Sequence, residues 1–484
     1  MPLDHLRPLT NNFWKKSLTA LIIGCLASLS MAPLSAWPIL FISFPTFYAL
    51  LSASQNKKQA FALGWLFGFG YFVCSLSWIG NALLVEGNPY KWAWPLAVSG
   101  LPALLAFFPA IAALLTRITA PDLKTIRGTL AFLLFFSAAE IARGTLFTGF
   151  PWNLYGYTWI SVLEIAQTAH ITTAYGLSAL TIFWAASPAF VLLSKNKTHK
   201  TIISAASILT ITLSYAYGFY RLNNTPIQYH KDMQVLLVQP NIKQSEKWSA
   251  HKIAAHFAML LEMSQNTQEN NNKTTYIIWP ETAISSVFLN DKGAMNALRA
   301  MLYTYPSNAA LLTGALIYNP KEKSYTNSLI LIGKDGNISN IYNKHHLVPF
   351  GEYIPFQKWI PLQPVVEFTG FKKGNGLQTF ETQEGLRYSP LVCYEIIFPG
   401  RVVHKNQNTD VIINVTNDGW YGNSAGPYQH LTQARFRAIE TGIPVIRVAN
   451  TGISAIINSL GETEYNTHLS EKISASSKIP LKIN

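Results

Sequence analysis

The sequence predicts a multi-span α-helical membrane bundle of about seven helices, followed by a domain of mixed α/β structure. Hydrophobic residues make up 49% of the chain and charged residues only 13%, against roughly 25% charged in ordinary soluble domains. This deficit is concentrated before residue 222, whereas short apolar runs separated by polar turns follow residue 230. We therefore expect a transmembrane helical domain at 1–222, an α/β domain at 230–470 and a polar C-terminal tail at 471–484.

The membrane prediction depends on stretches of about 20 mostly apolar residues, the length that a bilayer span needs. A cleaved signal peptide is the rival explanation for the first stretch, because Lys15 and Lys16 precede it. A second apolar stretch follows at once, however, and the prolines of MAPLSAWP suit a hairpin between two spans. The expected spans are 17–33, 36–53, 60–83, 92–116, 129–147, 172–194 and 201–220.

The cations between these spans predict how the chain is oriented. Breaks such as SQNKKQ and KNKTHK carry lysines, whereas the alternate breaks are poor in cations and rich in tryptophan and tyrosine. Because cationic loops stay in the cytoplasm, we expect a cytoplasmic N-terminus. An odd number of spans then places everything after residue 222 outside the cytoplasm.

Glu140 and Arg143 fall inside the fifth expected span, where charges are costly. Since they lie three residues apart, they share a helix face and are able to pair. A structural ion pair and direct contact with a lipid headgroup are both compatible with the sequence.

Several classes of protein are disfavoured. The net charge of +13 comes from scattered lysines and arginines, so we do not expect a nucleic-acid partner. Three cysteines cannot supply a disulfide framework. The sequence contains no GxxxxGK[ST] or HExxH motif, and neighbouring His345 and His346 would point to opposite faces of a strand. We expect no cofactor and no metal.

The second half of the chain reads as strands that are buried on both faces and covered by helices. The predicted strands are MQVLLVQPN, TTYIIWPET, AALLTGALIY, NSLILIG, YSPLVCYEII, DVIINVTNDGW and PVIRVANTG. The predicted helices are KIAAHFAMLLEMSQ, GAMNALRAMLYTY and HLTQARFRAIETG. This alternation predicts an α/β sandwich, in which chemistry gathers at strand ends.

Three strand ends carry reactive side chains: Glu281 in YIIWPE, Lys344 in SNIYNKHH and Cys393 in LVCYE. Singly, each has a structural explanation as a helix cap, a solvated flank or a small core residue. Together they supply a base, a cation and a nucleophile. A carboxylate is able to take the thiol proton as sulfur attacks a carbonyl. Lys344 and the backbone N–H of Tyr394 are candidates to stabilise the resulting oxyanion, and collapse gives a thioester.

These residues resemble a known family. The order Glu-Lys-Cys in WPE, YNKHHLVPFGE and CYE is similar to the nitrilase or carbon-nitrogen hydrolase superfamily, which has an α-β-β-α sandwich. With FTGFPW, VQPNIKQSEKW and the long motif from NDGWYG to VANTG, nearly the whole chain resembles the bacterial apolipoprotein N-acyltransferases.

The resemblance implies an enzyme of the bacterial inner membrane with a periplasmic catalytic domain. Its donor would be a phospholipid acyl chain and its acceptor the N-terminal amine of a diacylated apolipoprotein. Matched position by position, it implies Glu281 as general base, Lys344 as oxyanion stabiliser, Cys393 as nucleophile and Glu352 as a further active-site glutamate. It also implies Tyr394 and Glu395 as supporting residues and Trp248 and Trp420 as substrate-binding residues.

Some features stay open. The apolar segment from Val348 to Lys372 is expected either to dip into the bilayer surface or merely to cover the sandwich. Asn417 and Asp418 form either a turn or a second wall of the site. The resemblance implies a further C-terminal membrane helix, whereas the last residues are too polar to span. A membrane-anchored amidase and an inactive scaffold are the rival functions.

Overall fold

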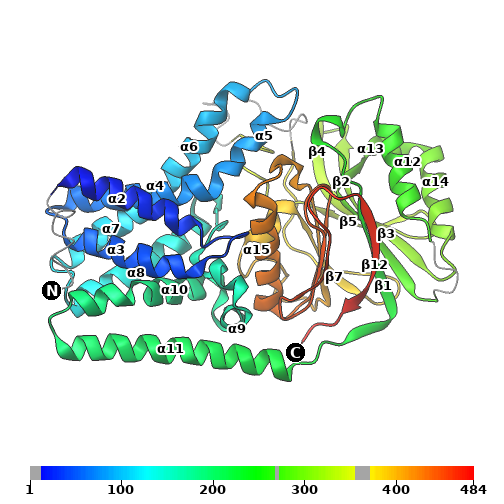
Figure 1. Ribbon diagram of the computed structural model, residues 1–484. Coiled ribbons are helices and arrows are strands. Elements are labelled where there is room, and N and C mark those ends of the chain that lie inside the picture. Colours follow the sequence, from blue (N-terminus) through cyan, green and yellow to red (C-terminus); the bar gives the residue numbers. More distant parts are fainter. Residues whose placement is uncertain (1–11, 267–271, 355–370, 484) are drawn as a thin grey trace. The chain divides into compact units, whose positions relative to one another are not determined.

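The computed structural model describes residues 12–266, 272–354 and 371–483, which belong to two compact units (Figure 1). The first, here the helical unit, comprises the chain up to Gly80 together with Trp92–Asn224 and Tyr428–Thr432. The second, here the α/β unit, comprises Asn81–Lys91, Thr225–Pro427 and Gln433–Asn484.

Helices lie in all seven stretches predicted as spans. They are α2 (Phe13–Ser28), α3 (Leu40–Ser52), α4 (Lys57–Leu76), α6 (Trp94–Leu105), α7 (Phe107–Thr119), α8 (Ile126–Thr145), α10 (Ala169–Leu193) and α11 (Lys197–Asn224). By length and composition, five described segments are able to cross a membrane: Lys57–Leu84, Lys91–Thr119, Ile126–Thr148, Ala169–Leu193 and Lys197–Asn224.

The first two predicted spans form shorter helices than expected. α2 has 16 residues and α3 has 13, below the roughly 20 that span a bilayer. Pro33 and Pro38 lie between them, and proline cannot continue a helical hydrogen-bond ladder. The prediction of about seven spans is therefore supported for five segments.

Small residues set the packing of α2 against α4. A Cβ atom built on Gly24 would lie 2.1 Å from the carbonyl oxygen of Phe67, and one on Gly70 would lie 2.3 Å from that of Leu21. These glycines allow the two backbones to approach closely, which is how helices commonly associate within membranes.

The charged pair in the fifth span is a structural ion pair. Arg143 donates to Glu140 at 2.9 Å, to the carbonyl oxygen of Phe150 at 2.7 Å and to Asn153 Oδ1 at 3.2 Å. Both charged side chains are buried within the helical unit. Of the two explanations that the sequence leaves open, these contacts favour the structural one.

The α/β unit contains two six-stranded sheets. In the first, the order is β12-β1-β2-β3-β4-β5, and in the second it is β11-β10-β9-β8-β7-β6. Each sheet has three parallel central strands, β1, β2 and β3 in one and β7, β8 and β9 in the other. The strands are β1 (Tyr229–Gln239), β2 (Thr274–Ser285), β3 (Ala309–Asn319), β4 (Ser324–Ile332), β5 (Ile338–Asn343), β6 (Phe380–Glu381), β7 (Arg387–Val392), β8 (Val411–Thr416), β9 (Val445–Ala449), β10 (Ala455–Ile457), β11 (Thr463–Asn466) and β12 (Ile473–Pro480).

The apolar core has two layers around the first sheet. One lies between the sheets and joins Val235 and Ile278 to Ile413 and Val448. The other packs the opposite face of the first sheet against α12 (Ile253–Met263) and α14 (Lys292–Tyr303). In Figure 1, α15 (Ala425–Thr441) lies beside the second sheet. The predicted α-β-β-α sandwich is therefore confirmed.

The segment 471–484, predicted as a polar tail, contains strand β12. This strand pairs antiparallel with β1, from Gln239 opposite Ile473 to Tyr229 opposite Pro480. Its residues alternate between half-buried and exposed until Ile479. Such alternation is typical of an edge strand with one wet face, and the three serines and one lysine of ISASSKIP hide the pattern in the sequence.

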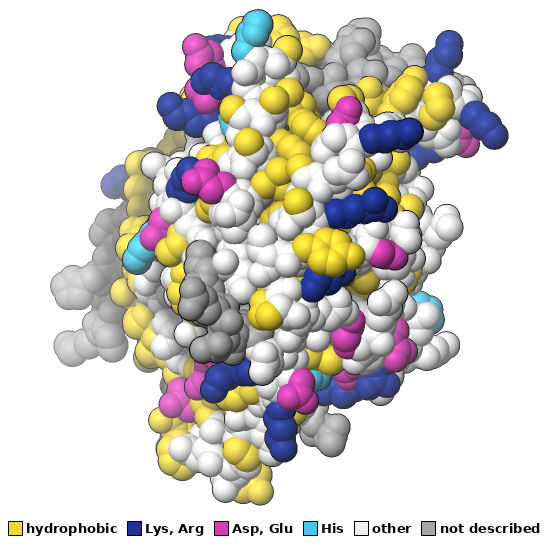
Figure 2. Space-filling model, turned by 90° about the vertical axis from the view of Figure 1, so that its right-hand side faces the viewer, with side chains coloured by type: hydrophobic (Ala, Val, Ile, Leu, Met, Phe, Trp, Pro, Cys, Tyr) yellow, Lys and Arg dark blue, Asp and Glu magenta, His cyan; other side chains and the backbone are white. Residues whose placement is uncertain are grey.

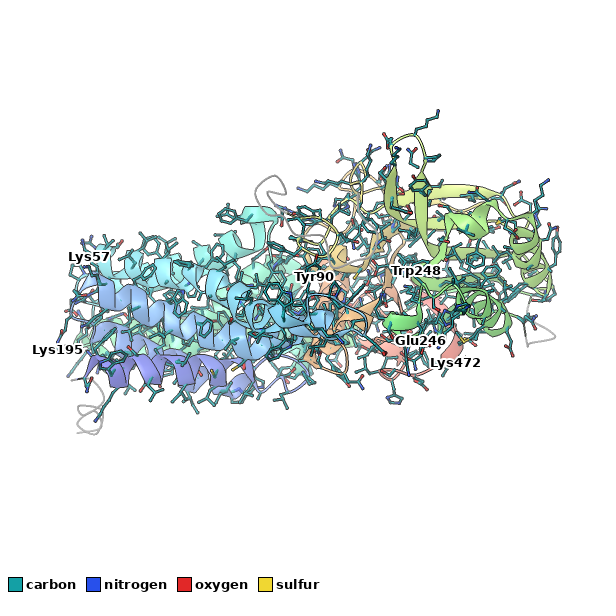
Figure 3. All side chains as sticks on the ribbon, turned by 90° about the horizontal axis from the view of Figure 1, so that it is seen from above. Lys57, Tyr90, Lys195, Glu246, Trp248 and Lys472 are labelled. Carbon is teal, nitrogen blue, oxygen red and sulfur yellow. The ribbon has the colours of Figure 1, made fainter. Side chains whose placement is uncertain are left out.

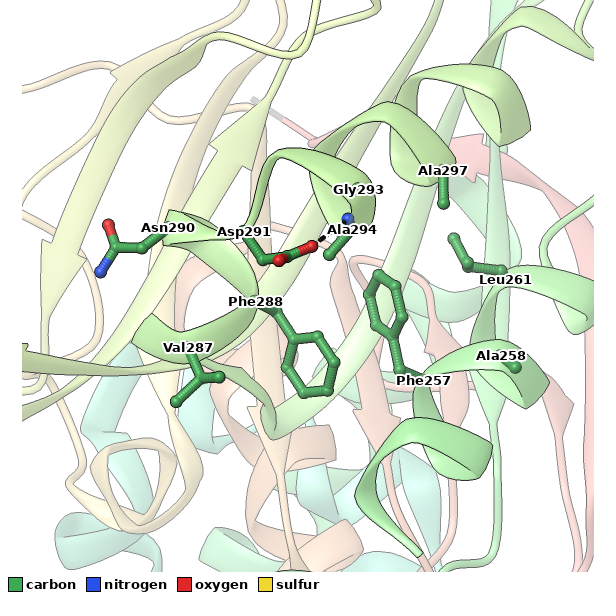
Figure 4. Close-up of a pocket in the computed structure, with 10 residues that line it drawn as sticks. All are labelled: Phe257, Ala258, Leu261, Val287, Phe288, Asn290, Asp291, Gly293, Ala294 and Ala297. Carbon is green, nitrogen blue, oxygen red and sulfur yellow. Dashed lines mark hydrogen bonds between the residues drawn. The ribbon is translucent and has the colours of Figure 1, made fainter. Parts of the chain in front are cut away.

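The outer helical layer carries a shallow apolar pocket between α12, α13 (Ser286–Asn290) and α14 (Figure 4). Phe257 and Phe288 stack there with ring centroids 4.5 Å apart. Figure 2 shows cationic, anionic and hydrophobic side chains interspersed on the face of the molecule turned toward the viewer. The residues that line the pocket come from this outer layer and do not include Glu281, Lys344 or Cys393.

Candidate active site

All three predicted catalytic residues are buried in the α/β unit. Lys344 directly follows β5 and Cys393 directly follows β7, as predicted. The prediction that a strand ends at Glu281 is wrong, because β2 continues past Glu281 to Ser285. Their exposed fractions are 6% for Glu281, 1% for Lys344 and 6% for Cys393. Buried charges are costly unless paired, so the contacts of these side chains indicate which of them are charged and what each is able to do.

Glu281 lies on a bulge in β2. Trp279 pairs with Thr313 and Ile284 with Ala315, so four residues of β2 face only one of β3, Gly314. A bulge of this kind re-aims a side chain out of the regular alternation. A Cβ on Gly314 would lie 2.4 Å from the carbonyl oxygen of Pro280 and 2.5 Å from Glu281 Cα. Only glycine therefore leaves room for the bulge.

Lys344 binds two carboxylates. Its Nζ lies 2.9 Å from Glu352 Oε1 and 3.5 Å from Glu281 Oε1. Asn327 donates through Nδ2 to the same two oxygens, at 3.1 Å and 2.7 Å. Burial acts to lower the pKa of Lys344, but the charges of Glu352 and Glu281 together raise it above its ordinary value. Lys344 is therefore an ammonium at neutral pH.

The remaining carboxylate oxygens are held by backbone N–H groups. Asn417 donates to Glu281 Oε2 at 2.8 Å, and Val348 donates to Glu352 Oε2 at 2.8 Å. Asn417 therefore forms part of a second wall of the site, one of the two explanations that the sequence leaves open. Asp418 beside it pairs with Arg447 at 2.7 Å.

Cys393 begins the short helix η8 (Cys393–Ile397) and has a φ of +53°. A non-glycine residue in this left-handed region is strained by about 1–3 kcal/mol, and such strain clusters at functional sites. Burial, reinforced by the charge of Glu281, raises the pKa of the thiol to about 12, while Lys344 acts to lower it. The resting sulfur is therefore protonated and needs a base to react.

Glu395 ties the Cys393 turn to the loop that follows Lys344. Its carboxylate accepts the N–H of Val392 at 2.8 Å, the N–H of His345 at 2.8 Å and the hydroxyl of Tyr342 at 3.0 Å. Burial would raise the pKa of Glu395, but the hydrogen bonds and charge of His345 and the Val392 N–H hold it below its ordinary value. These contacts hold the Cys393 turn in place, and the supporting role of Glu395 in catalysis stays a prediction.

The other predicted residues surround this cluster. Tyr394 is buried, with its ring 5.6 Å from His346 and 5.3 Å from Phe398. Trp248 is half-buried on the loop after β1, and Trp420 is half-buried at the end of the short helix η9 (Asp418–Trp420) after β8. Their assignment to substrate binding stays a prediction, and most of the apolar segment 348–372 lies outside the described residues.

Three contributors to the site were missed in the sequence. Asn327 is a polar residue within an apolar strand, which is itself a signal because buried amides need partners. Gly314 interrupts another apolar strand, and such glycines mark bulges or close backbone approach. Lys247 lies within the quoted motif VQPNIKQSEKW, but its burial could not be seen from the sequence.

Comparison with known proteins identifies both units. Residues 23–187 match the family model of the apolipoprotein N-acyltransferase N-terminal domain, and residues 234–472 match the carbon-nitrogen hydrolase model. A solved CN-hydrolase superfamily protein of Xanthomonas campestris is 22% identical and covers 52% of this chain and 91% of its own, with a TM-score of 0.38.

Full-length relatives are more similar. The apolipoprotein N-acyltransferase of Rhodopseudomonas palustris is 37% identical over 93% of this chain and 86% of its own length. The apolipoprotein N-acyltransferase of Brucella melitensis is 38% identical over 93% of this chain and 87% of its own. By this similarity along nearly its whole length, the chain belongs to the apolipoprotein N-acyltransferase family.

Proposed function

We propose that this chain transfers a fatty acyl group from a membrane phospholipid to the N-terminal amine of a diacylated apolipoprotein, through a thioester on Cys393. The observation that carries this proposal is the buried Glu281–Lys344–Glu352 cluster, electrostatically coupled to Cys393, in a chain of this family. The names of the relatives indicate the reaction, and the cluster offers the base and the cation that the nucleophile Cys393 needs.

In the first step, Glu281 takes the proton of Cys393 as sulfur attacks the ester carbonyl of the donor. The oxyanion that develops is stabilised by the Lys344 ammonium and the backbone N–H of Tyr394. The tetrahedral intermediate then expels the lysophospholipid alkoxide, which receives the proton from Glu281. The products are a Cys393 thioester and a lysophospholipid, and Glu281 is again a carboxylate.

In the second step, the free amine of the acceptor attacks the thioester carbonyl. Glu281 accepts a proton from the attacking nitrogen and delivers it to the departing sulfur, which restores the thiol. Glu352 keeps Lys344 charged and oriented through both steps, since its carboxylate lies 2.9 Å from Nζ. The slight exposure of Cys393 limits the access of water that would hydrolyse the thioester.

The site is expected on the periplasmic side of the inner membrane. Figure 3 shows Lys57 and Lys195 at the same end of the helical unit, as the positive-inside rule requires of cytoplasmic loops. The five long segments of the described chain begin with the one that starts at Lys57. An odd number of crossings from a cytoplasmic Lys57 leaves residue 225 outside, whether or not α2 and α3 cross.

Transfer and hydrolysis are separated by one experiment on the membrane-embedded protein. We expect acyl-labelled phospholipid to label the wild-type chain in a hydroxylamine-sensitive manner, and a diacylated lipopeptide to discharge the label as an N-acyl product. Label that leaves only to water would support a membrane-anchored amidase instead. Absence of label in the wild type would support the scaffold, and Cys393→Ser serves as the unlabelled control.

A further inference from the structure

Lys247 is a second buried lysine beside the catalytic cluster. It lies between Glu246 and Trp248, which Figure 3 labels in the α/β unit. Only 6% of its surface is exposed, whereas most lysines are solvated. A buried ammonium needs partners, so its contacts indicate its role.

Among the described residues, the two acceptors of the Lys247 ammonium lie on the bulge that presents Glu281. Its Nζ donates to the carbonyl oxygen of Glu281 at 2.9 Å and to Thr282 Oγ1 at 2.6 Å. Thr282 has a φ of +48°, so the backbone is strained at this point. A bulge leaves its extra residues outside the ladder of the sheet. Lys247 therefore supplies the donor that the neighbouring strand does not.

The charge of Lys247 also acts on the reacting groups. Burial lowers the pKa of Lys247 to about 8, and the charges of Glu281 and Cys393 oppose this lowering. His256 on α12 is a further titratable neighbour, near Glu246 and Lys252, and burial keeps its pKa below the ordinary value. Lys247 is therefore cationic at neutral pH and loses its charge as the pH rises through about 8.

We propose that Lys247 is a positioning residue for acyl transfer, which holds the Glu281 bulge in place and contributes positive charge to the Glu281–Cys393 pair. The proposal rests on the function proposed above and extends it beyond the residues that the family resemblance implies. Lys247 acts through Glu281 and the sulfur, not by contact with the substrate.

Acylation kinetics of the full-length, membrane-embedded protein test this proposal. We expect Lys247→Met to slow labelling of Cys393 about ten-fold or more, the scale of one hydrogen bond to a charged group, with little change in KM for the phospholipid. Lys252→Met is the matched control, because Lys252 lies on the same segment, half-exposed, and pairs only with Glu246 among the described ion pairs. It should label at the wild-type rate.

The pH profile separates positioning from mere structural support. Wild-type labelling should decline on the alkaline side near pH 8, where Lys247 loses its proton. Lys247→Arg keeps the charge, so its decline should move to higher pH. Thr282→Ala removes one acceptor only and should slow labelling less than Lys247→Met. If Lys247→Met matched the wild type in rate and pH profile, the proposal would be overturned.

Alkylation of Cys393 by iodoacetamide keeps the result independent of the lipid reaction. We expect Lys247→Met to lower the alkylation rate several-fold at a fixed neutral pH, because the thiolate loses a nearby positive charge. This readout is available even if no acyl label forms in the wild type. That outcome would contradict the proposed function but not the proposal about Lys247. If Lys247→Met fails to fold, Lys247→Arg and Thr282→Ala decide the question. An unchanged pH profile in Lys247→Arg together with an unchanged labelling rate in Thr282→Ala would overturn the proposal.

Discussion

Replacing Gly314 by alanine tests whether catalysis depends on the bulge that carries Glu281. The added Cβ would lie 2.4 Å from the carbonyl oxygen of Pro280, 2.5 Å from Glu281 Cα and 2.6 Å from the nitrogen of Thr282. Contacts of a Cβ under 3.0 Å essentially never occur, and all three atoms are backbone. Relief of the first contact alone needs a shift of at least 3.0 − 2.4 = 0.6 Å.

A shift of this size should lower the rate of thioester formation more than the stability of the fold. Overpacking in a well-packed region costs about 1–3 kcal/mol, whereas a misplacement of about 1 Å at a reacting group costs about 100-fold in rate. We therefore expect Gly314→Ala to fold with a modestly lowered melting temperature and to form the Cys393 thioester about 10- to 100-fold more slowly.

The assay is the initial rate of hydroxylamine-sensitive labelling, with thermal unfolding measured on the same sample. Gly100→Ala in α6 is the control, because a Cβ there meets nothing within 4 Å. Wild-type labelling by a folded Gly314→Ala protein would refute the reasoning that the bulge geometry places the base.

Glu352→Gln should slow thioester formation about ten-fold, because it removes one of the two carboxylate charges that raise the pKa of Lys344 and leaves only a weaker neutral acceptor; single-turnover labelling measures this. Glu395→Gln should lower both labelling and the free energy of unfolding. The stability that Glu395 contributes is present above its ordinary carboxyl pKa and is lost as the pH falls through its lowered folded pKa, so this variant should flatten the acid limb of a melting-temperature profile. Glu140→Gln should destabilise the helical unit by about 3–5 kcal/mol, because Arg143 is left buried without its counter-charge. Thermal unfolding in detergent measures this, and an unchanged melting temperature would contradict it.

Much of this arrangement could be predicted from the sequence. The central strands are continuous apolar runs, and they appear in the structure where the sequence places them, since burial on both faces leaves a plain signal. The reactive residues Lys344 and Cys393 also follow strands as predicted. The strand before Cys393 is buried, whereas β5 before Lys344 is mostly exposed, and β2 continues to Ser285 although the sequence predicts its end at Glu281.

Other features depend on tertiary contacts that a sequence does not display. The burial of Lys247 follows from the shape of a loop after β1, and its partners Glu281 and Thr282 are 34 and 35 residues away. The strand β12 is polar because it lies at a sheet edge, so its pattern resembles that of a solvated tail. The edge strand β12 and the buried position of Lys247 could therefore not be predicted from the sequence.

The central claim is that Cys393 carries the acyl group during transfer. Mass spectrometry of proteolytic peptides, after the membrane-embedded protein has been incubated with a phospholipid of defined acyl chains, tests it most directly. We predict that the peptide containing Cys393 gains the mass of one acyl group, and that both hydroxylamine and a diacylated lipopeptide remove it. An acyl group found on another residue, or an N-acylated lipopeptide formed at full rate by Cys393→Ser, would contradict the claim.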